Sequence, residues 1–271
     1  MTGADVAAGK EQTLARALAA TDRLVVAFSG GVDSTYLLAV AADVLGDQVL
    51  AATAVSPSLP EAERAAASQL AADLGVEHRE VLTDEAERAA YRRNDADRCF
   101  HCKSALFDAL EPIVAAAGGA AVAVGTITDD LGDHRPGQRA ASERGVLTPL
   151  ADAGLSKDDV RLLSRQRGLP TWDKPAAACL ASRVVYGLTV TPGRLTRIER
   201  AETWLRARLE PTVNLRVRDH GDLARIEVDA AVLPQVLGFS DAAAAHLRSL
   251  GWHHVTIDLE GFSSGSLNRS L

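Results

Sequence analysis

Short apolar runs alternate with longer stretches of helical period in the first half of the chain. The apolar runs are Leu24 to Phe28, Val49 to Val55, Val76 to Leu82 and Ala120 to Val124. Strands that alternate with helices in this way pair in parallel, and the helices then cover both faces of the sheet. We therefore expect an α/β fold with a parallel sheet, in which ligands bind outside the carboxyl ends of the strands.

The pattern changes after Gly187, where helical and strand-like segments follow in a different order. They are a helix from Pro192 to Leu209, strands from Val213 to Arg218 and from Ala224 to Val228, a helix from Asp241 to Leu250 and a strand from His253 to Leu259. A mixture of this kind is typical of a small α+β domain. The sequence therefore predicts two domains, residues 1–187 and residues 188–271.

A helix start is visible at Ser156. Ser156 and Asp159, three residues later, have the pattern of a capping box, and Gly168 is a typical helix stop. These signals predict a helix from Lys157 to Arg167.

The link between the first apolar run and the next helix reads Ser29-Gly30-Gly31-Val32-Asp33-Ser34. Two glycines let backbone N–H groups approach an anion, two serines add hydroxyl donors, and the helix contributes the positive end of its dipole. The loop lacks the Gly-Lys-Ser/Thr ending of a Walker loop and the Gly-x-Gly-x-x-Gly of dinucleotide folds. It predicts a site for the phosphates of a nucleotide at Ser29, Gly30, Gly31 and Ser34.

Polar residues also follow two other predicted strands. Ser56 comes after the second run, and the pair Gly125-Thr126 comes after the fourth. Because the carboxyl ends of parallel strands lie at one edge of the sheet, we expect the nucleotide to lie across these ends, with its nucleoside near Ser56 and Gly125. The polar stretch from Thr126 to Gly145 is expected to be an active-site loop.

Composition narrows the range of partners. The chain has 271 residues, 47% of them hydrophobic, and a formal net charge of −7. An acidic chain argues against a large nucleic-acid surface and favours a small anionic substrate. We see no apolar run of membrane-spanning length, and residues 1–10 lack the features of a secretory signal. We expect a cytoplasmic protein that binds neither membranes nor nucleic acids.

Three cysteines are the other candidates for chemistry. Cys99 and Cys102 form a C-x-x-C, and Cys179 follows in the run Pro175-x-x-x-Cys179-Leu180-Ala181-Ser182-Arg183. A C-x-x-C alone indicates a redox pair, half of a zinc site or two ordinary thiols. Three thiolates can hold a cubane iron–sulfur cluster and leave its fourth iron open, whereas a structural zinc needs a fourth ligand, for which His101 is a candidate.

Several motifs occur together and in order along nearly the whole chain. They are the loop Ser29 to Ser34, Arg98-Cys99-x-x-Cys102-Lys103, Gly125-Thr126, Pro175 to Arg183, Leu215-Arg216-Val217-Arg218, Leu223 to Glu227, and the stretch Asp258 to Asn268. The combination resembles the LarE family of ATP-dependent sulfur transferases, within the PP-loop ATP pyrophosphatase superfamily. The resemblance implies that ATP adenylates a carboxylate of a pyridinium dicarboxylate mononucleotide and releases pyrophosphate. The carboxylate then becomes a thiocarboxylate of the nickel-pincer nucleotide of lactate racemase.

The resemblance also implies roles for individual residues. Asp33 would help to bind Mg²⁺, and Lys103 would contact the α-phosphate. Arg183, Arg216 and Arg218 would bind the phosphate of the mononucleotide. Arg216 and Arg218 are two positions apart on a predicted strand and therefore share one face; without the resemblance, a solvated strand face is the simpler interpretation. The roles of Glu199 and Glu202 stay open.

The cysteine count bears on the source of sulfur. In one form of the family, Cys99, Cys102 and Cys179 would hold a [4Fe-4S] cluster that carries a transferable sulfide; in the other, Cys179 would give up its own sulfur and become dehydroalanine. All three positions are cysteines here, which favours the cluster form. A tRNA-thiolating enzyme, an ammonia-using synthetase and a non-catalytic nucleotide-binding module are the alternatives. The resemblance further implies homo-oligomers, such as hexamers, in which the second domain takes part.

Overall fold

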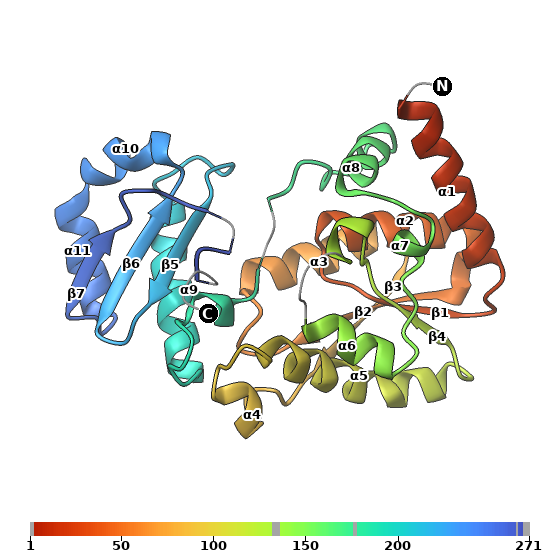
Figure 1. Cartoon of the computed structure of the whole chain (residues 1–271), viewed down its shortest axis with the longest axis horizontal. Helices are drawn as coiled ribbons and strands as arrows, with labels where there is room; N and C mark the ends of the chain where they lie inside the picture. Colours follow the sequence, from red (N-terminus) through yellow and green to blue (C-terminus); the bar gives the residue numbers. More distant parts are fainter. Residues whose placement is uncertain (1–2, 132–135, 176–177, 264, 268–271) are drawn as a thin grey trace. The chain divides into compact units, whose positions relative to one another are not determined.

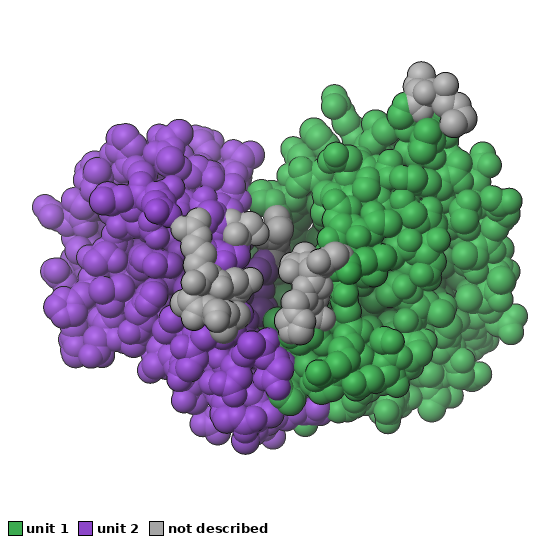
Figure 2. Space-filling model, viewed as in Figure 1, with its two compact units in different colours: residues 1–84, 99–177 green, residues 85–98, 178–271 purple. Residues whose placement is uncertain are grey.

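The computed structural model describes residues 3–131, 136–175, 178–263 and 265–267. The chain divides into two compact units, shown in different colours in Figure 2. Unit 1 comprises residues 1–84 and 99–177, and unit 2 comprises residues 85–98 and 178–271. The units therefore change at residue 177, before the boundary expected at 187, and a short early segment of the chain belongs to the second unit.

Unit 1 contains a four-stranded sheet in the order β3-β2-β1-β4, in which every pairing is parallel. The strands are β1 (Leu24–Ala27), β2 (Val49–Val55), β3 (Glu77–Leu82) and β4 (Ala121–Ala123). Each strand lies within one of the four apolar runs, and β2 has the expected ends. The predicted α/β fold with a parallel sheet is confirmed.

Helices cover both faces of this sheet (Figure 1). Along β1, Leu24 and Val26 belong to one core cluster and Val25 belongs to another. The first cluster includes side chains of α1 (Gly3–Ala19), α2 (Val32–Leu45), α3 (Glu61–Asp73) and α8 (Lys157–Gln166), and the second those of α5 (Arg98–Ala116) and α6 (Pro136–Glu143). Each fully buried Leu or Val contributes about 1.5–3 kcal/mol, so both layers fix the edge of the sheet where the loops emerge.

The short elements of unit 1 follow the strands and helices closely. They are η1 (Gly46–Gln48), η2 (Thr128–Asp130) and α7 (Pro149–Asp152). The capping box of α8 is confirmed, because the Asp159 N–H donates to Ser156 Oγ at 3.3 Å and the Ser156 N–H donates to Asp159 Oδ2 at 3.0 Å. Among the described helices, none has both the length and the apolar composition of a membrane span.

Unit 2 is built on a three-stranded sheet in the order β5-β6-β7. Strands β5 (Leu215–Asp219) and β6 (Leu223–Val228) are antiparallel, and β7 (His254–Ile257) runs parallel to β6. The helical elements are α4 (Ala89–Arg92), η3 (Leu180–Arg183), α9 (Pro192–Arg206), η4 (Ala230–Val232), α10 (Leu233–Leu237) and α11 (Ser240–Ser249). The small α+β architecture is confirmed. Helix α9 ends before the predicted Leu209, because Pro211 has no N–H to bond the carbonyl of Ala207.

Asn94 explains why residues 85–98 belong to unit 2. Its side chain is fully buried, and its Nδ2 donates to the carbonyls of Val185 at 2.8 Å and Leu188 at 3.1 Å. The Gly187 N–H donates back to the Asn94 carbonyl at 3.2 Å. Asn94 has a φ of +60°, a left-handed conformation that asparagine tolerates better than most residues. These contacts fasten the early segment to the chain that follows η3.

Candidate active site

The turn between β1 and α2 holds its own polar groups together. Ser29 Oγ lies 3.0 Å from Ser34 Oγ and accepts the Gly31 N–H at 3.4 Å. The Ser34 hydroxyl lies 3.3 Å from the Gly31 carbonyl, to which it can donate. No side chain caps the start of α2, so its first N–H groups are available to an anion. The structure therefore brings Ser29, Gly31 and Ser34 together at a helix N-terminus, in a ring of mostly long contacts that a phosphate can displace.

Two positions in this region require glycine. Gly30 has a φ of +66°, and a Cβ there would lie 3.2 Å from the Cα of Ala67. A Cβ on Gly125 would lie only 2.9 Å from the Ser34 nitrogen, closer than real Cβ atoms come. The end of β4 thus packs backbone against backbone on the start of α2, which places Gly125 and Thr126 beside the phosphate loop.

Ser56 follows the neighbouring strand β2. Its Oγ accepts the Ser58 N–H at 3.2 Å, which fixes the first turn after the strand. Because β2, β1 and β4 are adjacent in the sheet, Ser56, Ser29 and Gly125 all lie at the carboxyl edge. This is the arrangement that the sequence predicts for a nucleotide across the strand ends.

Asp33 forms an ion pair that the sequence did not indicate. Lys157 Nζ, on the first residue of α8, lies 2.8 Å and 2.6 Å from the two carboxylate oxygens of Asp33. The Lys157 N–H also donates to Asp129 Oδ2 at 2.9 Å. In the sequence Lys157 is visible only as the residue after a helix cap, and no local signal connects it with the loop. Both side chains are partly exposed, so a cation that binds Asp33 competes with a weak pair.

Lys174 is a second lysine that contacts the phosphate loop. Its Nζ donates to the Gly30 carbonyl at 3.1 Å and to Glu63 Oε2 at 2.7 Å. Glu63 lies in the first turn of α3. The loop therefore has two lysines beside it, each held by a carboxylate of unit 1.

Two of the cysteines lie at the start of α5. Cys99 is exposed and Cys102 is half-buried, and neither is in a disulfide bond. Lys103 is half-buried, and the backbone of Gly137 packs closely on its side chain. Cys179, in unit 2, is a half-buried free thiol. Within the ranges that the structure describes, no three His, Cys, Asp or Glu side chains are grouped so that they could hold a metal ion.

The active-site loop expected from Thr126 to Gly145 is described only in part. Its first turn is η2, where the Ile127 N–H donates to Asp130 Oδ2 at 3.1 Å, and its last part includes α6. Residues 132–135 lie outside the described residues.

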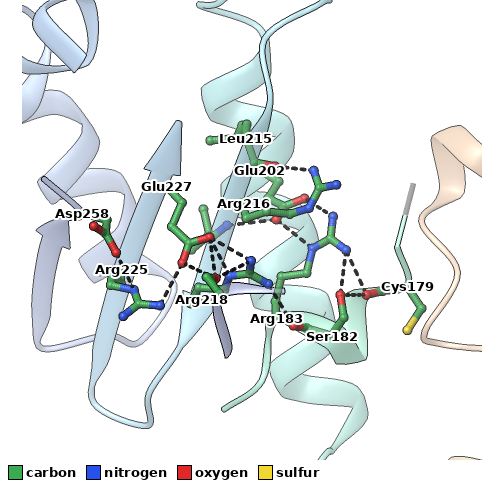
Figure 3. Close-up of polar contacts among 12 residues, drawn as sticks. Cys179, Ser182, Arg183, Glu202, Leu215, Arg216, Arg218, Arg225, Glu227 and Asp258 are labelled. Carbon is green, nitrogen blue, oxygen red and sulfur yellow. Dashed lines mark hydrogen bonds and ion pairs between the residues drawn. The ribbon is translucent and has the colours of Figure 1, made fainter. Parts of the chain in front are cut away.

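Arg183 and Glu202 form a buried ion pair in unit 2 (Figure 3). Arg183 Nε donates to Glu202 Oε1 at 3.0 Å and its Nη2 donates to Oε2 at 3.2 Å. Glu202 Oε1 also accepts the Val217 N–H at 2.9 Å. The sequence left the role of Glu202 open, and the structure gives it two partners on elements that precede and follow α9. Glu199, one turn earlier, is half-buried.

Arg218 belongs to a second buried pair beside the first. Its Nε donates to Glu227 Oε2 at 2.9 Å and its Nη2 donates to Ser266 Oγ at 3.0 Å. Arg225 donates to the other oxygen of Glu227 at 2.8 Å and also lies 3.5 Å from Asp258. Glu227 is fully buried, so its negative charge depends on these two guanidinium groups.

Arg216 lies between these pairs in sequence and has different contacts. Its Nη1 donates to the Leu215 carbonyl at 2.7 Å, and its guanidinium lies 5.2 Å from the centre of the Phe262 ring. Burial and the neighbouring charge of Arg183 lower the pKa of Arg216 to about 10. Arg216 and Arg218 are both buried, so the interpretation of a solvated strand face is wrong.

Comparisons with known proteins agree with these features. The profile of the asparagine synthase family matches residues 9–105, which include the phosphate loop. An uncharacterized protein of Synechocystis is 45% identical over 254 residues, 92% of this chain and 93% of the relative. The pyridinium-3,5-bisthiocarboxylic acid mononucleotide synthase of Lactiplantibacillus plantarum is 40% identical over 265 residues, 97% of this chain and 95% of that enzyme. An uncharacterized protein of Methanocaldococcus jannaschii is 26% identical over 242 residues, 89% of this chain and 91% of the relative.

The similarity to the Lactiplantibacillus enzyme extends over both units and is too high for two proteins that share only a fold. The turn of residues 29–34 lies at the carboxyl edge of the parallel sheet, where ligands bind in open α/β folds. The chain therefore belongs to the LarE family, whose members are ATP-dependent sulfur transferases with a PP-loop domain.

Proposed function

We propose that this enzyme converts a carboxylate of pyridinium-3,5-dicarboxylate mononucleotide into a thiocarboxylate, for nickel-pincer nucleotide synthesis. A carboxylate oxygen attacks the α-phosphorus of ATP, the bond to the bridging oxygen breaks, and pyrophosphate leaves. A sulfur nucleophile then attacks the acyl carbon of the adenylate, and AMP leaves with its oxygen. Adenylation is required because a carboxylate carbon is electron-rich and oxide is a poor leaving group.

One observation supports this proposal more than any other. The chain matches nearly all of an enzyme named for the bisthiocarboxylic acid product, and it has a phosphate loop at the edge of a parallel sheet. The loop supports the proposal that the enzyme binds ATP. The relationship to that enzyme supports the proposal that the carboxylate substrate is the pyridinium mononucleotide.

We assign the adenylating residues to unit 1. The loop hydroxyls and amides would bind the departing pyrophosphate, and the carboxylate of Asp33 would bind Mg²⁺, which neutralises charge between the phosphates. Lys103 would contact the α-phosphate. The phosphate ligands are Ser29, Gly30, Gly31 and Ser34, and the residues beside the nucleoside are Ser56, Gly125 and Thr126.

We assign binding of the mononucleotide's phosphate to residues of unit 2. Arg216 and Arg218 emerge from one strand, and the nearby charge of Arg183, which lowers the pKa of Arg216, is one that an anion bound to Arg216 would offset. This gives unit 2 the role of binding the substrate.

The three cysteines suit an iron–sulfur cluster. Cys99 and Cys102 are three positions apart at the start of α5, so their side chains emerge on one side of the helix. Thiolates are the ligands that iron–sulfur clusters prefer, and none of the three cysteines is in a disulfide bond. With Cys179 as the third ligand, a bound [4Fe-4S] cluster would supply a sulfide at the iron that the protein leaves open. The alternative is that Cys179 itself attacks the adenylate, and that loss of its Cα proton then expels the thiocarboxylate and leaves dehydroalanine.

One experiment tests the reaction and separates the two sulfur sources. Anaerobically purified protein, reconstituted with iron and sulfide, is incubated with MgATP and the pyridinium dicarboxylate mononucleotide. Pyrophosphate, the mass of the product and the mass of the peptide that contains Cys179 are then measured. Thiocarboxylate with an intact Cys179 supports the cluster, and thiocarboxylate with dehydroalanine supports the sacrificial route. Absence of both pyrophosphate and thiocarboxylate contradicts the proposed function.

A homo-oligomer and a cytoplasmic location remain predictions. Light scattering during size-exclusion chromatography of the full chain measures the first, and a single species of monomer mass would contradict it.

A further inference from the structure

The backbone carbonyls around Cys179 accept hydrogen bonds from three different arginines. Arg183 Nη1 donates to the carbonyls of Ala178 and of Cys179, the latter at 2.9 Å. Arg98 Nη1 donates to the Ala181 carbonyl at 2.9 Å, and Arg218 Nη1 donates to the Ser182 carbonyl at 3.0 Å. Four carbonyls of the five residues 178–182 thus face a guanidinium group.

Each of these guanidinium groups is held in place by a second partner. Both carboxylate oxygens of Glu202 accept hydrogen bonds from Arg183, and Glu227 accepts a hydrogen bond from Arg218. Arg98 donates to the Asn94 side chain, which is itself bonded to the carbonyls after η3. All three arginines are buried. A guanidinium that turned toward a ligand would leave a carboxylate or a carbonyl without its donor, which is unfavourable in a buried site.

The arginines bind backbone carbonyls of residues 178–182, and Arg183 is the one that binds the carbonyl of Cys179. In Figure 3 the carbonyl oxygen of Cys179 faces Arg183, while the sulfur points the other way. The Ser182 hydroxyl adds a hydrogen bond to the same carbonyl at 2.7 Å. The backbone is therefore fixed and the thiol is left for reaction.

We propose that Arg98, Arg183 and Arg218 are positioning residues, which together hold the loop of residues 178–182 and so set the place of the Cys179 thiol. The inference rests on the proposed function, in which Cys179 is a cluster ligand or a sulfur donor. The sequence predicts that Arg183 binds the phosphate of the mononucleotide. The inference replaces that role with positioning, because the donors of Arg183 bind Glu202 and the loop carbonyls. Arg216 then becomes the principal ligand for the phosphate of the substrate.

The reactivity of the thiol tests this directly, without activity or a cluster. Apo protein is treated with iodoacetamide, and alkylation of each cysteine is followed by peptide mass spectrometry. Arg183→Lys and Arg98→Lys keep the charge, but one ammonium cannot serve all the acceptors of the guanidinium. We expect Cys179 to react at least about fivefold faster relative to Cys99, because the loop opens more often. Arg194→Lys is the matched control: Arg194 pairs with Asp219 in the same unit, and the ratio should stay within about twofold.

Two further measurements keep the test decisive. Ser182→Ala removes the hydroxyl that donates to the Cys179 carbonyl and accepts from Arg183 Nη1 at 3.1 Å; it should fold even if an arginine variant does not, and should raise the ratio by about twofold to threefold. Calorimetric titration with nicotinate mononucleotide then separates positioning from binding. Arg183→Lys should change the Kd by less than about twofold, whereas loss of a direct phosphate contact weakens binding by tenfold or more.

The proposal is overturned if the alkylation ratio is unchanged in the folded variants, or if Arg183→Lys weakens binding of the mononucleotide and leaves the ratio unchanged. Failure of the proposed function gives a different result. In that case wild-type protein forms no thiocarboxylate, while the arginine variants still alter the reactivity of Cys179.

Discussion

The phosphate loop of unit 1 (residues 29–34) and the arginine cluster of unit 2 (Arg183, Arg216, Arg218 and Arg225 with Glu202 and Glu227) both contain ion-paired side chains. The two sets of ion pairs differ in how far they are buried. At the loop, Lys157 and Asp33 are 38% and 24% exposed. In the cluster, Arg218 and Glu227 are 6% and 0% exposed. An exposed pair is worth about 0–1 kcal/mol and exchanges partners readily. Breaking a buried pair leaves an uncompensated charge and costs several times more. The difference indicates that the loop is built to open for a ligand, and that most of the cluster is built to keep its shape.

The largest expected effect removes the buried carboxylate. Glu227→Ala leaves Arg218 and Arg225 without their shared partner, so we expect the free energy of unfolding to fall by about 3–5 kcal/mol. Urea denaturation measures it. The control Glu80→Ala breaks a more exposed pair with Arg64 and should lower the free energy of unfolding by much less. Equal decreases in the free energy of unfolding of the two variants would contradict the expected difference between buried and exposed ion pairs.

The next effect concerns catalysis at the loop. Gly125→Ala would place a Cβ 2.9 Å from the Ser34 nitrogen and displace the start of α2. We expect ATP-dependent pyrophosphate release to fall by about 100-fold, as for other misplaced sites. The control Gly9→Ala lies in α1 with no heavy atom within 4 Å of the added Cβ, and should leave the rate unchanged. Normal pyrophosphate release by Gly125→Ala would show that the loop tolerates the displacement.

A smaller effect is expected from the exposed pair. Lys157→Ala removes the cation that competes with Mg²⁺ for Asp33. The Mg²⁺ concentration that gives half-maximal pyrophosphate release should therefore fall by up to about fivefold, which corresponds to about 1 kcal/mol. A magnesium titration at fixed ATP measures it. Lys10→Ala, which breaks the pair with Asp159, is the control and should not change the magnesium requirement. A higher requirement in Lys157→Ala would mean that Lys157 itself helps to bind the nucleotide.

The smallest expected effect is a decrease in the free energy of unfolding as the pH falls. Burial lowers the pKa of His220 and His246 in unit 2, and of His78 in unit 1, below the usual value of 6.5. The unfolded chain therefore binds their protons first as the pH falls, and the free energy of unfolding decreases below about pH 6.5. Urea denaturation at pH 7.5 and 5.5 measures the decrease, which should be smaller in His220→Gln. A decrease that is unchanged in that variant would assign the pH dependence to other groups.

The sequence predicts what local patterns encode. Strand β2 and the capped start of α8 depend on neighbours a few residues apart, and both were placed correctly. The phosphate loop is also local, since Ser29 and Ser34 meet across one turn. The partners of the charged groups are different: Lys157 and Asp33 are 124 positions apart, and Arg98 and Ala181 are 83 apart. No periodicity or spacing connects such residues. The sequence therefore predicted a functional role for Arg183, but it gave no indication that Glu202 and the loop carbonyls take up its donors.

Asn94 has a consequence for the modular exchange of parts between related enzymes. The chain passes from unit 1 to unit 2 at residue 84, returns at residue 98 and leaves again at residue 177. A fragment that ends at residue 177 keeps Asn94 but loses the carbonyls of Val185 and Leu188, so a buried amide is left without acceptors. A graft of unit 2 from a relative must therefore carry residues 85–98 as well as residues 178–271. Gene fusions with a single crossover cannot satisfy this, whereas a cassette with two inserted segments can.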